Sequence, residues 1–156
     1  MLPTISDLPN LRAPDDAAGP DDGLVSIVVV GAHLTGMPLN HELTGPGGTL
    51  ARSCRTAGDY RLFVLPDTKP PKPGLIREPG FAGAGLEVEV WHVSAAAFGR
   101  FVQNIPAPLG IGKVTLDDGS QVSGFLCEAY AIAGAMEVTH LGGWRSYIKS
   151  MTKASS

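Results

Sequence analysis

The chain lacks the features that mark membrane-spanning and nucleic-acid-binding proteins. No apolar run approaches the roughly 20 residues needed to cross a bilayer, and the N-terminus has no basic start followed by an apolar stretch. Nor is there a basic stripe for nucleic acid: the first 23 residues hold five aspartates against one arginine, and the remainder carries a net charge of only +1. We therefore expect a cytoplasmic protein with neither a membrane nor a nucleic acid as its partner.

Cysteines and clustered metal ligands are also scarce. Cys54 and Cys127 are isolated thiols, and in a reducing compartment we expect them to be small buried groups rather than a disulfide. The four histidines form no close metal-ligand pattern with Asp, Glu or Cys; they are His33, His41, His92 and His140. The sequence therefore predicts no metal site.

What is present suits an ordinary globular domain. With 156 residues, 44% of them hydrophobic and 17% charged, the chain is long enough for one domain with a substantial core. Residues 1–23 are acidic and contain four prolines, which predicts a flexible tail or linker. We expect the domain to occupy residues 24–150 and residues 151–156 to form a frayed tail.

The most informative segment is the apolar run Leu24–Val30 and the glycine-bracketed turn that follows it. A run this uniformly apolar predicts a strand buried on both faces. Gly31 and Gly36 would let backbone N–H groups approach a ligand closely, and His33 between them is suited to moving protons near neutral pH. The alternative is a polar residue in an ordinary tight turn.

Periodicity and turn residues predict the other elements. They are antiparallel strands at 49–56 and 60–65 joined by a short turn, a stiff proline-rich loop at 69–74, a short strand near Leu75, a strand at 86–93, a helix at 95–104 capped by Ser94, a hairpin turn at 117–120 before a long strand at 121–132, and a short amphipathic helix from Trp144. On the strand at 121–132, Glu128 would share a face with apolar residues. It should then be paired, hydrogen-bonded or shifted in pKa, either as a structural ion pair or as a chemical group.

Several motifs, in order over about residues 24–149, carry a family resemblance. They are Gly31-Ala32-His33-Leu34 with Pro38-Leu39-Asn40, Arg55-Thr56-Ala57 with Tyr60-Arg61-Leu62, Pro71-Lys72-Pro73-Gly74-Leu75, Val88-Glu89-Val90-Trp91, Pro106 to Gly112, Gly124-Phe125 with Cys127-Glu128, and Gly142-Gly143-Trp144-Arg145. Together they resemble the C-terminal domain of allophanate hydrolase.

The resemblance implies an α+β fold with a mixed, partly closed, barrel-like sheet and a few flanking helices, related to the γ-glutamylcyclotransferase fold. In that wider family the loop equivalent to residues 31–36 binds a carboxylate, and a Glu near the end of the following helix is the acid/base. The corresponding stretch here, residues 101–105, contains no carboxylate. This departure argues against cyclotransferase chemistry.

For function, the resemblance implies that an amidase releases ammonia from allophanate and that this domain decarboxylates the resulting N-carboxycarbamate, with His33 as the essential residue. An imidazole can deliver the proton that the departing nitrogen needs, so no cofactor is required. The dianionic substrate would need N–H donors and a cation. The candidate substrate-binding residues are Gly31, Ala32, Leu34, Gly36, Asn40, Arg55, Tyr60 and Lys72, with Glu128 as possible support.

Three functions remain open from the sequence. The first is an enzyme acting on a small dicarboxylate or carbamate through His33. The second is a non-catalytic module that docks an amidase partner or forms a homodimer, since a fold does not impose a function and no amidase motifs occur in these 156 residues. The third, a cyclotransferase, would be favoured by a carboxylate entering the cavity.

Overall fold

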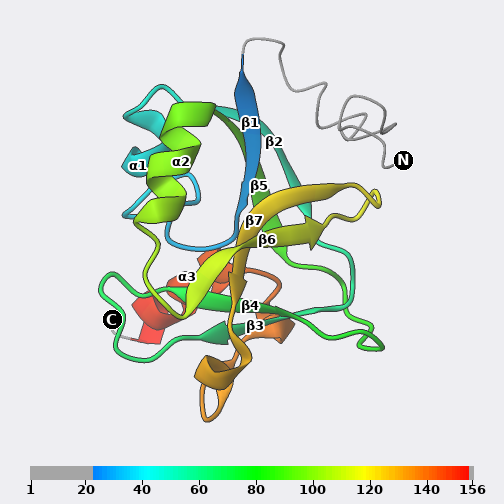
Figure 1. The fold of residues 1–156 in the computed structure, drawn as a ribbon. Helices are drawn as coiled ribbons and strands as arrows, with labels where there is room; N and C mark the ends of the chain where they lie inside the picture. The colour runs from blue at the N-terminus through cyan, green and yellow to red at the C-terminus, as the bar shows by residue number, and fades with distance from the viewer. Residues whose placement is uncertain (1–22, 155–156) are drawn as a thin grey trace.

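The computed structural model describes residues 23–154, which form two β-sheets with flanking helices in an α+β fold (Figure 1). The larger sheet has five strands in the order β2-β5-β1-β7-β6, and the smaller has three in the order β4-β3-β8. In chain order, the elements are β1 (Leu24–Val29), α1 (His41–Thr44), β2 (Thr49–Arg55), β3 (Tyr60–Val64), β4 (Pro73–Arg77), β5 (Glu87–Ser94), α2 (Ala95–Gln103), β6 (Leu109–Thr115), β7 (Gln121–Cys127), the 3₁₀ turn η2 (Ala129–Ile132), β8 (Met136–Glu137), the 3₁₀ turn η3 (Thr139–Leu141) and α3 (Trp144–Ala154). The acidic segment 1–22 lies outside the described residues.

The larger sheet is mixed and curls toward closure. Its central strand β1 pairs antiparallel with β5 and parallel with β7, and residues 27–30 are almost entirely buried, as the apolar run predicts. At one end the two edge strands meet: an isolated bridge joins Thr56 to Leu116, and the Asp117 N–H donates to the Arg55 carbonyl at 2.9 Å. The expected partly closed sheet is confirmed, and its closure is limited to this corner.

The predicted hairpin between strands 49–56 and 60–65 is wrong. β2 pairs with β5 in the larger sheet, whereas β3 pairs with β4 and β8 in the smaller sheet. The chain crosses between the sheets at residues 56–59, because Tyr60 and Leu62 are buried in the smaller sheet while β2 finds a long antiparallel partner in β5. A short connection favours a hairpin only when no distant strand offers a better pairing.

The helices agree with the sequence more closely. The Ser94 hydroxyl accepts from the Ala97 N–H at 3.1 Å and caps α2, which packs against β1 and β5. Figure 1 shows α1 and α2 on one side of β1, and α3 near the smaller sheet. α3 begins at the predicted Trp144 and continues to Ala154, into the segment for which a frayed tail is expected.

The strand predicted at 121–132 ends at Cys127, and the backbone then forms η2. Glu128 is therefore exposed, and the prediction of a carboxylate in an apolar row is wrong at this position. The buried carboxylate is Glu89, at 3% exposure on β5. Both faces of β5 are buried, so its alternating sequence does not mark one solvent-facing side.

Candidate functional site

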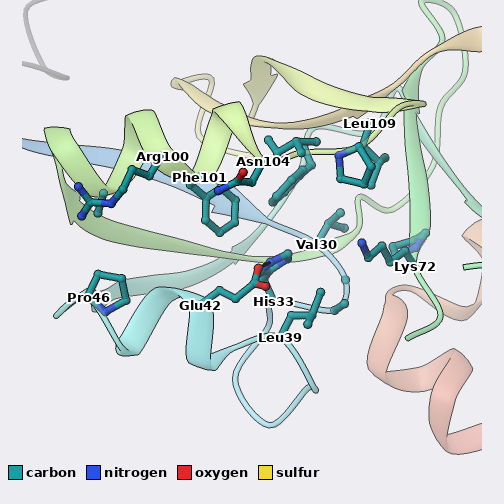
Figure 2. Close-up of a pocket in the computed structure, with 17 residues that line it drawn as sticks. Val30, His33, Leu39, Glu42, Pro46, Lys72, Arg100, Phe101, Asn104 and Leu109 are labelled. Atoms are coloured by element: carbon teal, nitrogen blue, oxygen red, sulfur yellow. Dashed lines mark hydrogen bonds and ion pairs between the residues drawn. The ribbon is translucent and has the colours of Figure 1, made fainter. Parts of the chain in front are cut away.

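One cavity of about 390 Å³ opens between the loop after β1, helices α1 and α2, and the start of β4 (Figure 2). Most of its wall is apolar, with a few charged side chains at its rim, as is common for small-molecule sites. The lining residues are Val30, Gly31, Ala32, His33, Leu39, Glu42, Pro46, Lys72, Pro73, Ala97, Arg100, Phe101, Asn104, Ile105, Pro106, Leu109 and Phe125.

The loop after β1 forms two successive tight turns that bring His33 to this cavity. The Leu34 N–H donates to the Gly31 carbonyl at 3.0 Å, and the Met37 N–H donates to the Leu34 carbonyl at 2.9 Å. The Asn40 side chain donates to the His33 carbonyl at 2.9 Å and ties the loop to the start of α1. Within residues 23–154, the N–H groups of Ala32 and His33 donate to no protein acceptor.

Gly31 must be glycine because the chain passes very close to β4. A Cβ at this position would clash with Cδ of Pro73, and the proline ring cannot rotate out of the way. Gly36 closes the loop with a backbone φ of +86°, a conformation that residues with a Cβ rarely adopt. Glycine is therefore required at both ends of the loop, for two different reasons.

Gly31→Ala is expected to displace the loop. Overpacking against Pro73 should lower the free energy of unfolding by about 1–3 kcal/mol, measured by urea denaturation, and weaken ligand binding in the cavity. Gly99→Ala is the control, because on α2 a Cβ would meet nothing within 4 Å and should stabilise the protein by about 0.5–1 kcal/mol. Unchanged stability in Gly31→Ala would contradict the close approach.

His33 lies between two aromatic rings and one carboxylate. Its imidazole stacks on Phe125 with ring centroids 5.2 Å apart and meets the edge of Phe101 at 4.9 Å. Its Nε2 is 2.7 Å from Oε1 of Glu42, on α1. Because a carboxylate only accepts, Nε2 carries the hydrogen of this bond, and the imidazole is held in one orientation.

Burial lowers the pKa of His33 below its ordinary value; the hydrogen bond to Glu42 and its charge oppose this shift, and the positive charge of Lys72 adds to it. The imidazole is therefore neutral at pH 7 while the cavity holds no anion. As the pH falls, the His33 imidazole becomes protonated at a higher pH in the unfolded chain than in the folded chain. His33 thus contributes stability that is present above about pH 6.5 and is lost as pH falls through the pKa of the folded state.

The cavity brings together only part of the predicted binding set. Gly31, Ala32, His33 and Lys72 line it. Leu34 is fully buried in the core, while Gly36 and Asn40 shape the loop from outside the lining set.

The proposed contacts of Arg55 and Tyr60 with substrate find no support in the geometry. The Arg55 guanidinium donates to the Gly85 carbonyl at 3.1 Å, and the buried Tyr60 hydroxyl accepts from the Thr115 N–H at 2.9 Å. Neither residue lines the cavity, and neither does Glu128. Arg55 ends β2 and Tyr60 begins β3, where the chain crosses between the two sheets, so the hydrogen bonds of these two residues stabilise the fold.

Two charged residues of the cavity, Glu42 and Arg100, are missing from the sequence prediction. Arg100 lies on α2, for which the sequence predicts a helix but no role in a site, and Glu42 lies on the one-turn helix α1, where the sequence predicts neither a helix nor a strand. The His41-Glu42 pair directly after the Asn40 motif is the only signal that could have pointed to Glu42. Its carboxylate side chain is about half exposed at the rim, at 45%.

Neither a metal cluster nor a membrane span is found in the part of the chain that the structure describes. Among residues 23–154, no group of three or more His, Cys, Asp or Glu side chains could hold a metal ion. No helix in the same range is long and apolar enough to cross a bilayer. Both cysteines are free thiols, with Cys127 buried and Cys54 half-buried.

Comparison with known proteins gives consistent similarities. The sequence model of the allophanate hydrolase C-terminal domain matches residues 25–149. The urea amidolyase of Saccharomyces cerevisiae is 38% identical over 150 residues, which cover 92% of this chain but 8% of the yeast protein. The chain therefore spans a small fraction of the curated relatives that it matches.

Solved structures agree with the sequence matches. Allophanate hydrolase of Kluyveromyces lactis superposes with a TM-score of 0.77 at 38% identity, covering 81% of this chain and 21% of that one. The uropathogenic E. coli-specific protein c4763 superposes with a TM-score of 0.73 at 36% identity, and the match covers 81% of this chain and 96% of that chain. A γ-glutamyl cyclotransferase at 13% identity, with a TM-score of 0.50, shares the fold alone.

Proposed function

Because the chain belongs to the family of allophanate hydrolase C-terminal domains, we propose that it decarboxylates N-carboxycarbamate, with His33 as the proton donor. The observation that carries this proposal is the placement of His33: a nearly buried imidazole, fixed by Glu42, on the wall of an open cavity that also holds Lys72. No side chain of residues 23–152 fills the cavity, which favours a binding site over a purely structural module.

The chemistry needs one proton and no other reactant. The substrate has two carboxylates on one nitrogen, and the bond between that nitrogen and one carboxylate carbon breaks. The electron pair of that bond goes to the nitrogen, which takes the proton of the His33 imidazolium, while the departing carboxylate becomes CO2. Carbamate and neutral His33 remain, and solvent returns the proton to the imidazole.

The charges of the cavity suit a dianion when His33 is protonated. Lys72 and Arg100 bring two positive charges and Glu42 one negative charge, and the imidazolium adds a third positive charge. In Figure 2 the Lys72 ammonium points toward His33 from the side opposite Arg100. With the dianion bound, the site is electrically balanced, which is the condition for burying charge at low cost.

The free N–H groups of Ala32 and His33 supply the donors that a carboxylate requires, without any side-chain rearrangement. The neighbouring rings Phe101 and Phe125 keep water from His33, which strengthens electrostatic interactions in the cavity. We propose that the substrate is supplied by an amidase, because the relatives are named for allophanate hydrolysis and urea amidolysis and are far longer than this chain.

The direct test follows CO2 release. N-carboxycarbamate is generated in place by a separate amidase acting on allophanate, and CO2 is measured with and without this chain. Acceleration by the chain supports the proposal. Equal rates with and without it favour the alternative of a docking or dimerisation module.

One observation favours a second candidate. The cavity does contain a carboxylate, Glu42, although it comes from α1 and not from residues 101–105. A carboxylate beside the anion loop is what a γ-glutamyl cyclotransferase would need as its acid/base. Release of 5-oxoproline from a γ-glutamyl compound, without any effect on CO2 release, would replace the decarboxylase proposal by this one.

Dicarboxylate binding is expected to take up a proton. Malonate resembles the two carboxylates of the substrate, and its charge should raise the pKa of His33, which burial lowers and which Glu42, Lys72 and His41 also influence. Between about pH 8 and about pH 6 the affinity should therefore increase, by at most about tenfold per pH unit, as expected for one linked proton.

Isothermal titration calorimetry in two buffers of different ionisation enthalpy measures this proton directly. His33→Gln is the matched variant, because glutamine can still donate to Glu42 but does not titrate. Its malonate affinity should be nearly independent of pH over the same range. A wild-type affinity that does not change with pH would contradict protonation of His33 in the complex.

A further inference from the structure

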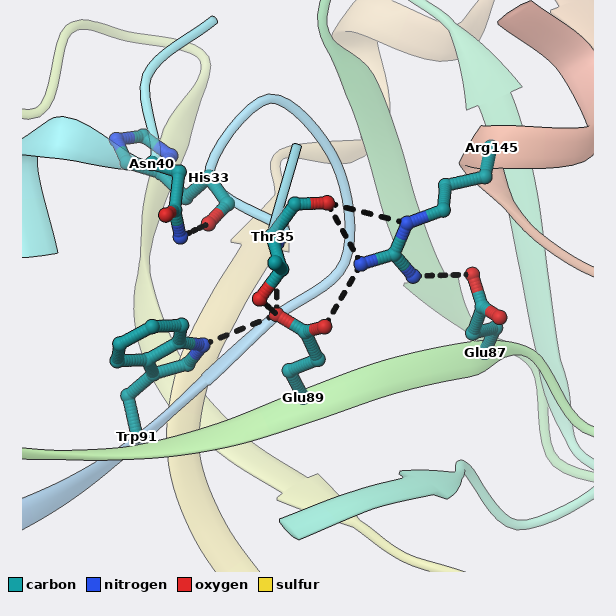
Figure 3. Close-up of polar contacts among 7 residues, drawn as sticks. All are labelled: His33, Thr35, Asn40, Glu87, Glu89, Trp91 and Arg145. Carbon is teal, nitrogen blue, oxygen red and sulfur yellow. Dashed lines mark hydrogen bonds and ion pairs between the residues drawn. The ribbon is translucent and has the colours of Figure 1, made fainter. Parts of the chain in front are cut away.

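A buried carboxylate lies beside the loop that carries His33 (Figure 3), and it does not line the cavity. Glu89, at 3% exposure on β5, receives hydrogen bonds on both oxygens. Oε1 accepts from the Thr35 N–H at 2.8 Å, the Thr35 hydroxyl at 3.0 Å and the Trp91 indole N–H at 3.1 Å. Oε2 accepts from Nη2 of Arg145 at 2.7 Å. Four donors therefore converge on one carboxylate.

Arg145, on α3, holds the same loop residue from the other side. Its Nε and Nη2 both donate to the Thr35 carbonyl, at 3.2 and 2.9 Å, and its Nη1 donates to Glu87 at 2.7 Å. Thr35 thus has its N–H, its hydroxyl and its carbonyl all bound by two side chains from β5 and α3. Thr35 is only two residues from His33, although it is exposed on the surface.

This arrangement is an inefficient way to stabilise a core. Apolar side chains of similar volume often do as well as a buried ion pair or better, because removing charges from water has a large cost. The neighbours Val88 and Val90 on β5 are apolar and buried. What an apolar residue at position 89 could not do is fix the three polar groups of Thr35 in space.

We propose that Glu89 and Arg145 are positioning residues that fix the loop through Thr35 and thereby set the orientation of the His33 imidazole. The inference rests on the proposed function for its catalytic consequence, but its geometric content does not depend on it. Backbone rotation at Thr35 would change the direction of the loop that carries His33. A displacement of about 1 Å at a reacting group can lower a rate by about 100-fold.

Glu89 remains charged in this setting. Burial would raise the pKa of its carboxyl, but the hydrogen bonds from Thr35, Arg145 and Trp91 together outweigh burial and lower it. Glu89→Gln is therefore a substitution that removes a charge while nearly preserving shape. It places an NH2 group where one oxygen now accepts, so that either the Thr35 contacts or the Arg145 contact must be lost.

The test compares Glu89→Gln with a matched control, Glu137→Gln. Glu137 also accepts from an arginine, Arg61 at 2.9 Å, and from a threonine hydroxyl, Thr139 at 2.8 Å, but it lies in the smaller sheet. In Glu89→Gln we expect kcat for CO2 release to fall by about 10–100-fold with a smaller change in KM. In Glu137→Gln we expect both constants to stay within about twofold.

A second readout separates positioning from folding and from the proposed reaction. NMR of the imidazole follows the chemical shifts and the titration of His33 in the folded protein, whether or not the chain decarboxylates anything. These should change in Glu89→Gln and remain as in wild type in Glu137→Gln. An unchanged His33 titration together with an unchanged malonate affinity in Glu89→Gln would overturn the inference. Failure of the wild-type chain to accelerate CO2 release would overturn only the proposed function.

Two milder variants decide the matter if Glu89→Gln does not fold. Thr35→Val removes one hydroxyl donor at an exposed position, and Arg145→Lys keeps the positive charge but cannot bind Thr35 and Glu89 together. Each should alter the His33 resonances and lower kcat while the protein remains folded. Wild-type resonances in both variants would overturn the inference.

Discussion

Replacing His33 with glutamine is expected to reduce CO2 release from N-carboxycarbamate by about 100- to 10,000-fold, the range typical of removing a positioned proton donor. Glutamine can still donate a hydrogen bond to Glu42, so the loop and the cavity should keep their shape. What it cannot do is hold a proton at neutral pH and release it to the departing nitrogen. The loss should therefore appear chiefly in kcat, with a smaller rise in KM because the imidazolium charge that balances the bound dianion is also absent.

His140→Gln is the matched control for this experiment. His140 is an exposed histidine on η3 that does not line the cavity. Its rate should equal that of the wild type. If His33→Gln retained the wild-type rate, His33 would have no part in the reaction, and the proton would have to come from another group in the cavity or from solvent.

Trp144→Ala is expected to produce the largest loss of stability, about 3–5 kcal/mol in the free energy of unfolding. Trp144 begins α3, is 1% exposed and packs on Tyr147 with ring centroids 4.9 Å apart. Its removal leaves a large cavity beneath the helix, which can close only if α3 moves. Because the next residue is Arg145, the contacts of α3 with Thr35 should weaken as well.

Urea denaturation followed by far-UV circular dichroism measures this effect. Tyr130→Ala is the control: Tyr130 is 66% exposed on η2, and its loss should change the free energy of unfolding by less than about 0.5 kcal/mol. If Trp144→Ala were as stable as Tyr130→Ala, α3 would contribute little to the core. That result would also weaken the positioning role assigned to Arg145.

Local signals gave reliable predictions where the structure depends on neighbouring residues. The Ser94 cap and the start of α3 at Trp144 are where the sequence indicates them, and the turn at 117–120 does join β6 and β7. Each depends on hydrogen bonds or steric preferences within a few residues. The loop bearing His33 depends on distant residues as well, because Gly31 lies against Pro73 on β4 and Thr35 is held by Glu89 and Arg145.

Long-range pairing explains the failures. Strands β2 and β3 are close in sequence, but β2 pairs with β5, and no local pattern shows that a distant strand will be the better partner. Glu128 and Glu89 show the same limit. Glu128 lies outside the sheet because β7 ends at Cys127. Glu89 is buried, and its ion-pair partner Arg145 comes from α3, 56 residues away in the sequence.

The contact between Arg145 and Thr35 joins positions 110 residues apart. A ribosome therefore produces the turn with the imidazole long before it produces the helix that secures it. During synthesis this turn can form early, but it reaches its final direction only after α3 has docked. A truncation that removes α3 should therefore leave His33 in the chain but without the contact that fixes its orientation, even where the remaining residues fold.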